Sequence, residues 1–244
     1  MPHMLDTILF DLDGTLLHFS QDAFITAYFA RLSKVFTEMN MDAKMSIKAV
    51  WAGTKAMAFN DGSRSNAERF WAVFAEQLNL TDEQRVAVEA ACDDFYTNEF
   101  DSVKSVVAPN NVSKRLVRAL AAKGYNVVLA TNPMFPACAV KTRLGWTGLE
   151  PQDFLLITHY ENCAYCKPNP GYYRGIFAKI NKAPEQCLMA GNNPVEDMAA
   201  GALGSETFLV TNCLENESGE DITVFRRGTL AELEVYLMSL PDIN

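Results

Sequence analysis

The chain of 244 residues has no long hydrophobic run. No stretch reaches the roughly 18 apolar residues of a membrane helix, and the N-terminus lacks the long apolar core of a signal peptide. We therefore expect a cytoplasmic protein with no membrane contact. Its 21 Lys and Arg are outnumbered by 30 Asp and Glu, which gives a formal net charge of -9. This balance argues against a nucleic-acid partner, because binding that backbone requires clustered cations, but it allows small phosphorylated ligands.

Metal-binding patterns of cysteine and histidine are also scarce. Among six cysteines and three histidines there is a single CxxC pair, Cys163 and Cys166, with no second CxxC and no spaced pair of histidines. A closed zinc site usually needs both halves. We expect reduced thiols with structural or incidental roles. Half a zinc site, or a redox pair next to Lys167, is the alternative.

The most informative segment is residues 8–17, which read I-L-F-D-L-D-G-T-L-L. The apolar run predicts a buried parallel strand, and Gly14 marks a turn directly after two carboxylates, Asp11 and Asp13. Ligands of open α/β sheets bind beyond the carboxyl ends of the strands. Two acids in one cavity repel each other, which a bound Mg²⁺ would offset, and a carboxylate can also act as a covalent nucleophile. The alternative is that both acids only cap the turn.

Three later segments extend this pattern. Thr131 ends the apolar run of residues 127–130, Lys167 stands before Pro168, and residues 191–197 read G-N-N-P-V-E-D. Together with Asp11-x-Asp13-Gly14-Thr15, these segments and their order resemble the haloacid dehalogenase (HAD) superfamily, in the subfamily with a helical cap of the first type. The resemblance covers roughly residues 5 to 210.

The resemblance implies a role for each matched residue. Asp11 would be the nucleophile that takes the phosphoryl group. Asp13 would protonate the leaving oxygen and then activate water, a kind of help typically worth about 10²–10⁴-fold. Thr131 would donate a hydrogen bond to a phosphoryl oxygen, and Lys167 would stabilise charge on the transferring group. Asn132, which follows Thr131, is a candidate substrate contact.

The resemblance also implies a Mg²⁺ cofactor. Its ligands would be Asp11, Asp13 (through the backbone carbonyl), Asn192 and Asp197. The family usually has Gly-Asp where this chain has Gly191-Asn192, so a neutral oxygen replaces a charge and we expect weaker binding of Mg²⁺. Asp197 is expected to act behind the direct ligands or through a water. Asn193 or Glu196 nearer the metal, or simple loop capping by Asn192, are the alternatives.

Helical periodicity dominates the segment after the first motif. Apolar residues recur at helical spacing near 21–39, 43–58, 66–79 and 82–100, and Thr81 with Gln84 forms a capping-box pattern. From about residue 105, helices and strands alternate, which is typical of a parallel sheet covered on both faces. We predict an α/β fold with a Rossmann-like doubly wound parallel sheet core, residues 1–16 and 105–244, and an inserted all-helical cap domain, residues 17–104.

The later elements are predicted in alternating order: helix 111–123, strand 126–131, helix 136–144, strand 154–158, helix 170–181, strand 187–190, a helix to about 203, and strand 206–210. Thr229 and Glu232 form a second capping box that opens the last helix.

The cap would close over Asp11, exclude bulk water and select the substrate. Candidate substrate contacts in it are Lys55, Asn60 and Arg64, with a solvated surface as the alternative. The Phe- and Trp-rich positions of the insert are expected to form the core of a helix bundle.

The predicted function is a Mg²⁺-dependent phosphatase that hydrolyses a small phosphorylated metabolite through an aspartyl-phosphate. Haloacid dehalogenases proper generally lack an acid at the position of Asp13, which favours phosphate esters over C–halogen bonds. A phosphosugar mutase, or a catalytically weakened phosphate-binding regulatory protein, is the alternative. A monomer or a homodimer is expected.

Overall fold

The computed structural model describes residues 4–243 and contains a six-stranded sheet in the order β5-β4-β1-β6-β7-β8, with every neighbouring pair parallel. Its strands are β1 (Thr7–Phe10), β4 (Asn126–Leu129), β5 (Leu156–Ile157), β6 (Cys187–Gly191), β7 (Glu206–Val210) and β8 (Arg227–Gly228). A doubly wound parallel sheet is thereby confirmed.

β1 lies at the centre of the sheet because its sequence, T-I-L-F, has no side chain that needs water. All four residues are fully buried. In register, Phe10 lies between Leu129 of β4 and Ala190 of β6. A continuous apolar run of this type is typical of strands covered on both faces.

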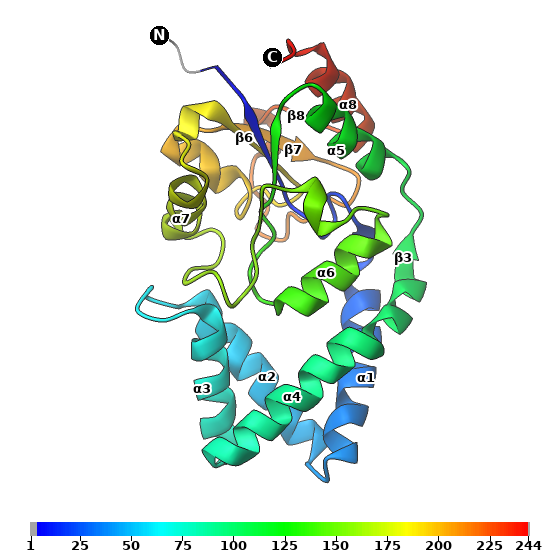
Figure 1. The fold of residues 1–244 in the computed structure, drawn as a ribbon, viewed down its shortest axis with the longest axis vertical. Coiled ribbons are helices and arrows are strands. Elements are labelled where there is room, and N and C mark those ends of the chain that lie inside the picture. The colour runs from blue at the N-terminus through cyan, green and yellow to red at the C-terminus, as the bar shows by residue number, and fades with distance from the viewer. Residues whose placement is uncertain (1–3, 244) are drawn as a thin grey trace.

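Helices cover both faces of the sheet, and strand residues alternate between them (Figure 1). Ile8 and Phe10 of β1 share one hydrophobic cluster with residues of α5 (Val112–Ala122), α6 (Ala137–Trp146) and α8 (Leu230–Ser239). Leu9 points the opposite way, into a second cluster with α7 (Pro170–Ile180). The period of two along the strand therefore sorts the side chains into two cores.

Four helices between the first strand and the rest of the sheet form a separate bundle, at the bottom of Figure 1. They are α1 (Gln21–Glu38), α2 (Ala43–Ala58), α3 (Asn66–Leu78) and α4 (Asp82–Asn98). Capping boxes begin α3 at Ser65 and α4 at Thr81. The chain enters and leaves the bundle through a short antiparallel pair, β2 (His18–Phe19) with β3 (Val107–Ala108).

Most predicted elements agree with the structure, but some bounds were wrong. The strand predicted for 126–131 ends at Leu129 and the one predicted for 154–158 covers only Leu156–Ile157. The predicted helix up to 203 is 3-10 helix over Met198–Leu203. The strands β2, β3 and β8 were not predicted. Each is two residues long, which is too short to leave a periodic pattern in the sequence. The capping box at Thr229 is confirmed.

The predicted limits of the inserted cap, 17–104, stay a prediction, and residues 1–3 and 244 of the predicted core lie outside the described residues. Among residues 4–243, no helix is both long and apolar enough to cross a membrane.

Candidate active site

Three neighbouring strands end beside one another and deliver the predicted motifs to one place. β1 runs into Asp11, β4 into Thr131 and β6 into Asn192, and β1 is hydrogen-bonded to both of the others. The chain leaves β1 to one side for β4 and later returns to the other side for β6. Ligands bind at such a reversal of strand order. A cleft of about 200 Å³ opens there, and its lining includes Asp11, Asp13, Thr131, Asn132, Asn192 and Asp197.

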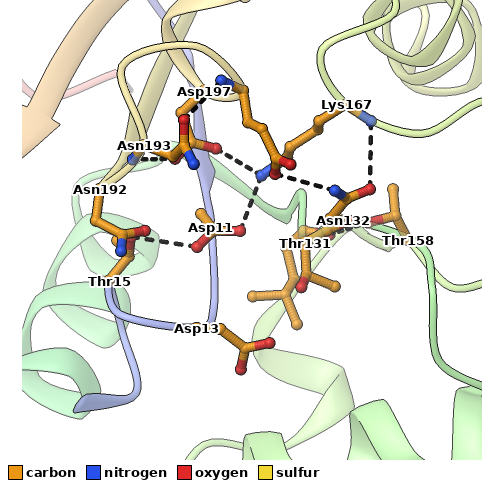
Figure 2. A network of polar contacts seen from close by, with 12 residues as sticks. Asp11, Asp13, Thr15, Thr131, Asn132, Thr158, Lys167, Asn192, Asn193 and Asp197 are labelled. Atoms are coloured by element: carbon orange, nitrogen blue, oxygen red, sulfur yellow. Dashed lines mark hydrogen bonds and ion pairs between the residues drawn. The ribbon is translucent and has the colours of Figure 1, made fainter. Parts of the chain in front are cut away.

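Lys167 joins two buried carboxylates at the floor of this cleft (Figure 2). Its Nζ lies 2.8 Å from Oδ1 of Asp11 and 2.6 Å from Oδ1 of Asp197. The three side chains are nearly excluded from solvent, with 1% to 6% of each residue exposed. Asp197 also accepts a hydrogen bond from the backbone N–H of Asn193 at 2.9 Å. Both oxygens of Asp197 are therefore occupied by protein, whereas Asp11 keeps Oδ2 directed away from the lysine.

The charges of this cluster are tightly linked. Burial raises the pKa of Asp11 well above its usual range, and the Lys167 ammonium opposes that rise. Burial works against the charge of Lys167, yet the Asp11 and Asp197 carboxylates outweigh it and raise the pKa of the lysine. Lys167 thus keeps its positive charge, and its ammonium favours the ionised form of the Asp11 carboxyl.

Asn192 lies against the turn after β1, where Gly14 leaves room for it, and Gly191 leaves room for Asp197. Gly14 has φ +77°, and a Cβ there would lie 2.1 Å from Nδ2 of Asn192; a Cβ on Gly191 would lie 2.1 Å from the carboxyl of Asp197. The Asn192 amide nitrogen donates to the Cys213 carbonyl at 2.6 Å, which turns Oδ1 toward the hydroxyl of Thr15 at 3.2 Å. This hydroxyl is also 3.3 Å from Oδ2 of Asp11. Oδ1 of Asn192 and Oδ2 of Asp11 therefore both face the Thr15 hydroxyl.

The residues after β4 are fixed through their backbone and amide groups. The Thr131 carbonyl accepts hydrogen bonds from the hydroxyls of Thr158 at 2.7 Å and Tyr172 at 2.8 Å. The Asn132 side chain accepts from the Lys167 backbone N–H at 3.3 Å and donates to Glu196 at 2.9 Å. Asn132 therefore links the Lys167 loop to the loop after β6, as Figure 2 shows in part.

Arg143 is a site residue that the sequence reasoning missed. It is fully buried on α6, and its Nη1 forms an ion pair with Oδ2 of Asp13. Its guanidinium centre lies 4.2 Å from the centre of the Phe135 ring. Helical spacing could have indicated its burial. Arg143 follows Ala139 by four residues and Val140 by three, so it lies on the apolar face of the helix. The ion pair with Arg143 therefore fixes the position of the Asp13 carboxylate.

Glu215, in the loop after β7, is a second missed residue. It lines the cleft, and its backbone N–H donates to the Asn192 carbonyl at 3.0 Å. Burial, together with nearby Asp13 and Glu196, raises the pKa of Glu215 to about 7. No local motif marks it, because it meets the site only through the return of the chain across the sheet.

The donor groups in the cleft fit a magnesium ion held by few protein ligands. Five carboxyl groups line it, from Asp11, Asp13, Glu196, Asp197 and Glu215, while ion pairs come from Lys167 and Arg143. Oδ1 of Asp13 is buried and has no hydrogen-bond partner. No group of three or more His, Cys, Asp or Glu within residues 4–243 forms a metal cage. Mg²⁺ commonly uses one or two carboxylates, with water and substrate phosphate completing its shell.

The predicted contacts from the helical bundle do not reach this cleft. Lys55 and Arg64 are exposed, and neither lines it. Asn60 is 4% exposed, and its amide donates to the Arg64 carbonyl at 3.0 Å and to Asn66 Oδ1 at 2.9 Å. Its side chain therefore fixes the loop between α2 and α3.

The cysteines are free thiols throughout the described part of the chain. Burial raises the pKa of Cys163 to about 11 and that of Cys166 to about 12, so both thiols are neutral.

This chain belongs to the haloacid dehalogenase-like hydrolase family, whose model matches residues 5–204. It is accordingly a hydrolase. No curated protein matches the chain.

Solved structures share its fold over nearly the whole length. A 2-haloacid dehalogenase from Pseudomonas syringae pv. Tomato DC3000 has a TM-score of 0.65 at 15% identity, covering 97% of this chain and 99% of that one. A HAD phosphatase from Thermococcus onnurineus has a TM-score of 0.60 at 14% identity, covering 98% and 100%. A HAD-hydrolase from Bacillus subtilis bound to magnesium has a TM-score of 0.57 at 20% identity, covering 96% and 99%. At these identities the similarity establishes the fold alone.

Proposed function

We propose that the protein is a Mg²⁺-dependent phosphatase that hydrolyses a small phosphate monoester through an aspartyl-phosphate at Asp11. The observation that carries the proposal is the pairing of a buried Asp11, 2.8 Å from Lys167 Nζ, with a second acid, Asp13, on the same cleft. An alkoxide leaving group needs a proton and a halide does not. A second acid at the mouth of the cleft therefore favours ester cleavage.

The proposed reaction has two steps, and Asp13 acts in both. In the first, an oxygen of Asp11 attacks phosphorus, the P–O ester bond breaks, and Asp13 gives its proton to the departing oxygen. In the second, Asp13 takes a proton from water, the water oxygen attacks the phosphorus of the aspartyl-phosphate, and the Asp11 carboxylate is regenerated as phosphate leaves. Lys167 stabilises charge on the transferring group, and Thr131 donates its hydroxyl hydrogen bond to a phosphoryl oxygen.

Asp11 and Asn192, with the backbone carbonyl of Asp13, would hold the Mg²⁺. Asp197 would not contact the ion directly but would position Lys167, with which it forms an ion pair. When bound, the ion supplies positive charge to the phosphoryl oxygens among five carboxyl groups. The cytoplasmic location, and a monomer or homodimer, stay predictions.

Replacing Asn192 with aspartate is expected to lower the Mg²⁺ concentration for half-maximal activity by about tenfold, because a charged ligand replaces a neutral one. The gain is limited by loss of the amide donor to the Cys213 carbonyl. Titration of activity with Mg²⁺ measures the change. Asn212→Asp, in the loop after β7, is the control for added charge. An unchanged titration for Asn192→Asp would remove Asn192 from the metal site.

Replacing Asp13 with asparagine is expected to affect substrates according to their leaving groups. For an alkyl phosphate, kcat/KM should fall by about 10²–10⁴-fold, since the alkoxide loses its acid. For p-nitrophenyl phosphate, whose leaving group needs no proton, kcat/KM should fall far less, while kcat falls for both because water activation is lost. Steady-state kinetics with the two esters makes the comparison. Equal losses in kcat/KM would contradict the role of Asp13 as the acid.

The mutase alternative predicts isomer formation from sugar phosphates in place of free phosphate. The regulatory alternative predicts no turnover of any phosphate ester at millimolar Mg²⁺. Release of inorganic phosphate from a broad ester panel, with and without a chelator, separates all three.

A further inference from the structure

A cavity of about 200 Å³ lies where the helical bundle meets the loops after β4 and β5. It is lined by side chains of all four helices and by Met134, Phe135 and Tyr160. Most of the Phe- and Trp-rich positions pack into the core of the bundle, as expected, with Phe24, Phe36 and Phe74 buried. Several of these aromatic residues also line the cavity: examples are Phe24, Phe29, Phe36, Trp51, Phe70 and Phe74. Tightly packed cores contain few voids of this size, so the cavity requires an explanation.

The wall of the cavity offers little to a polar ligand. The hydroxyls of Tyr28 and Tyr96 hydrogen-bond to each other. The Trp71 indole N–H donates to the Tyr160 hydroxyl at 3.2 Å. The polyol of a sugar would lose its water there and find these groups already bonded, so its binding is disfavoured.

Thr54 and Cys92 of the wall follow the same pattern, whereas Asp13 and Gln21 lie where the cavity meets the cleft. The Thr54 hydroxyl donates to the Val50 carbonyl at 2.9 Å. Burial raises the pKa of the Cys92 thiol to about 12, so this group is neutral.

The cavity adjoins the catalytic cleft. Four residues line both: Asp13, Gln21, Met134 and Phe135. Asp13 is the group that protonates the departing oxygen in the proposed reaction. The carbon skeleton attached to that oxygen therefore extends from Asp13 into the bundle, while the phosphoryl group lies at Asp11.

We propose that the cavity binds the leaving group of the substrate and that this group is apolar: the substrate is a phosphate monoester of a hydrophobic alcohol. This assignment rests on the proposed function for the orientation of the ester, but the cavity's preference for apolar chains can be measured without turnover. Burial of each methylene is worth about 0.8 kcal/mol, or roughly fourfold in affinity.

The test is calorimetric binding of n-alkylphosphonates from ethyl to octyl, with Mg²⁺, because their C–P bond is not hydrolysed. Affinity should rise by up to about fourfold per methylene until the cavity is full, with an increasingly negative heat-capacity change. A polyhydroxylated phosphonate of matched length should bind no tighter than the ethyl compound. Equal affinities for ethyl and octyl, or tighter binding of the hydroxylated compound, would overturn the assignment.

Ile25→Phe places a ring into the cavity and should flatten the dependence on chain length. Ala30→Phe, an exposed position of the same helix that does not line the cavity, is the matched control. Wild-type length dependence in Ile25→Phe would show that the chain binds elsewhere. Length-dependent binding without hydrolysis of the corresponding alkyl phosphates would leave the cavity assignment standing and refute the phosphatase.

Discussion

Asp11→Asn is expected to reduce phosphatase turnover by about 10⁴-fold or more, the scale at which removing a covalent nucleophile acts. The amide keeps the shape of the carboxylate and can still accept from Lys167 and Thr15, so the fold should persist. What it loses is the nucleophilic oxygen anion. Measurement of phosphate release from a good substrate, with circular dichroism to check folding, determines the loss.

Asp6→Asn is the matched control for this substitution. Asp6 lies just before β1, at the opposite end from Asp11, where its carboxylate pairs with Lys182 at 2.6 Å. It makes the same chemical change on the same segment without touching the cleft, so its turnover should stay near that of the wild type. Substantial activity in Asp11→Asn would contradict the nucleophilic role.

Lys167→Met should abolish activity and also destabilise the fold by about 3–5 kcal/mol, because it leaves two buried carboxylates without their shared cation. Asp11 and Asp197 are 6% and 1% exposed, so water cannot replace the ammonium. Denaturant unfolding measures the loss. Lys182→Met is the control, because the ion pair of Lys182 with Asp6 is more exposed than that of Lys167 with Asp11. It should lower the free energy of unfolding by only about 1 kcal/mol.

The stability deficit of Lys167→Met should depend on pH in a defined direction. Burial raises the pKa of Asp11 in the folded protein, and loss of the lysine raises it further. A carboxyl whose folded pKa exceeds its unfolded value destabilises the fold as pH rises through the folded pKa. The deficit should therefore shrink as pH falls through the folded pKa of Asp11, which lies well above its ordinary value of 3.8. A deficit that is absent, or that grows on acidification, would refute the charge arrangement.

The positions of the candidate catalytic residues follow from local sequence. An apolar strand that must be buried on both faces has to lie in the centre of a parallel sheet, and the polar residue that ends it must emerge at the carboxyl edge. Asp11, Thr131 and Asn192 each end such a run, so their meeting was predictable. Gly14 and Gly191, which allow Asn192 and Asp197 to approach, were visible in the same motifs.

Arg143 and Glu215 were not predictable in the same way. Each reaches the site through tertiary packing of a segment whose local pattern gives only a helix or a loop. Asn60 shows the opposite error, because a polar residue near a loop was interpreted as a ligand contact although its amide is used to fix that loop. The cavity beside the bundle was missed because helical periodicity shows which side chains face inward but not whether they fill all the space there.

The central claim is that the Asp11 side chain forms a covalent bond to phosphorus. Borohydride reduction of enzyme quenched during turnover converts an aspartyl-phosphate into homoserine, which mass spectrometry of the peptide containing residues 4–31 can assign to one position. The account predicts homoserine at position 11 and at neither Asp6 nor Asp13. Continued release of phosphate with no modification of Asp11 would contradict it.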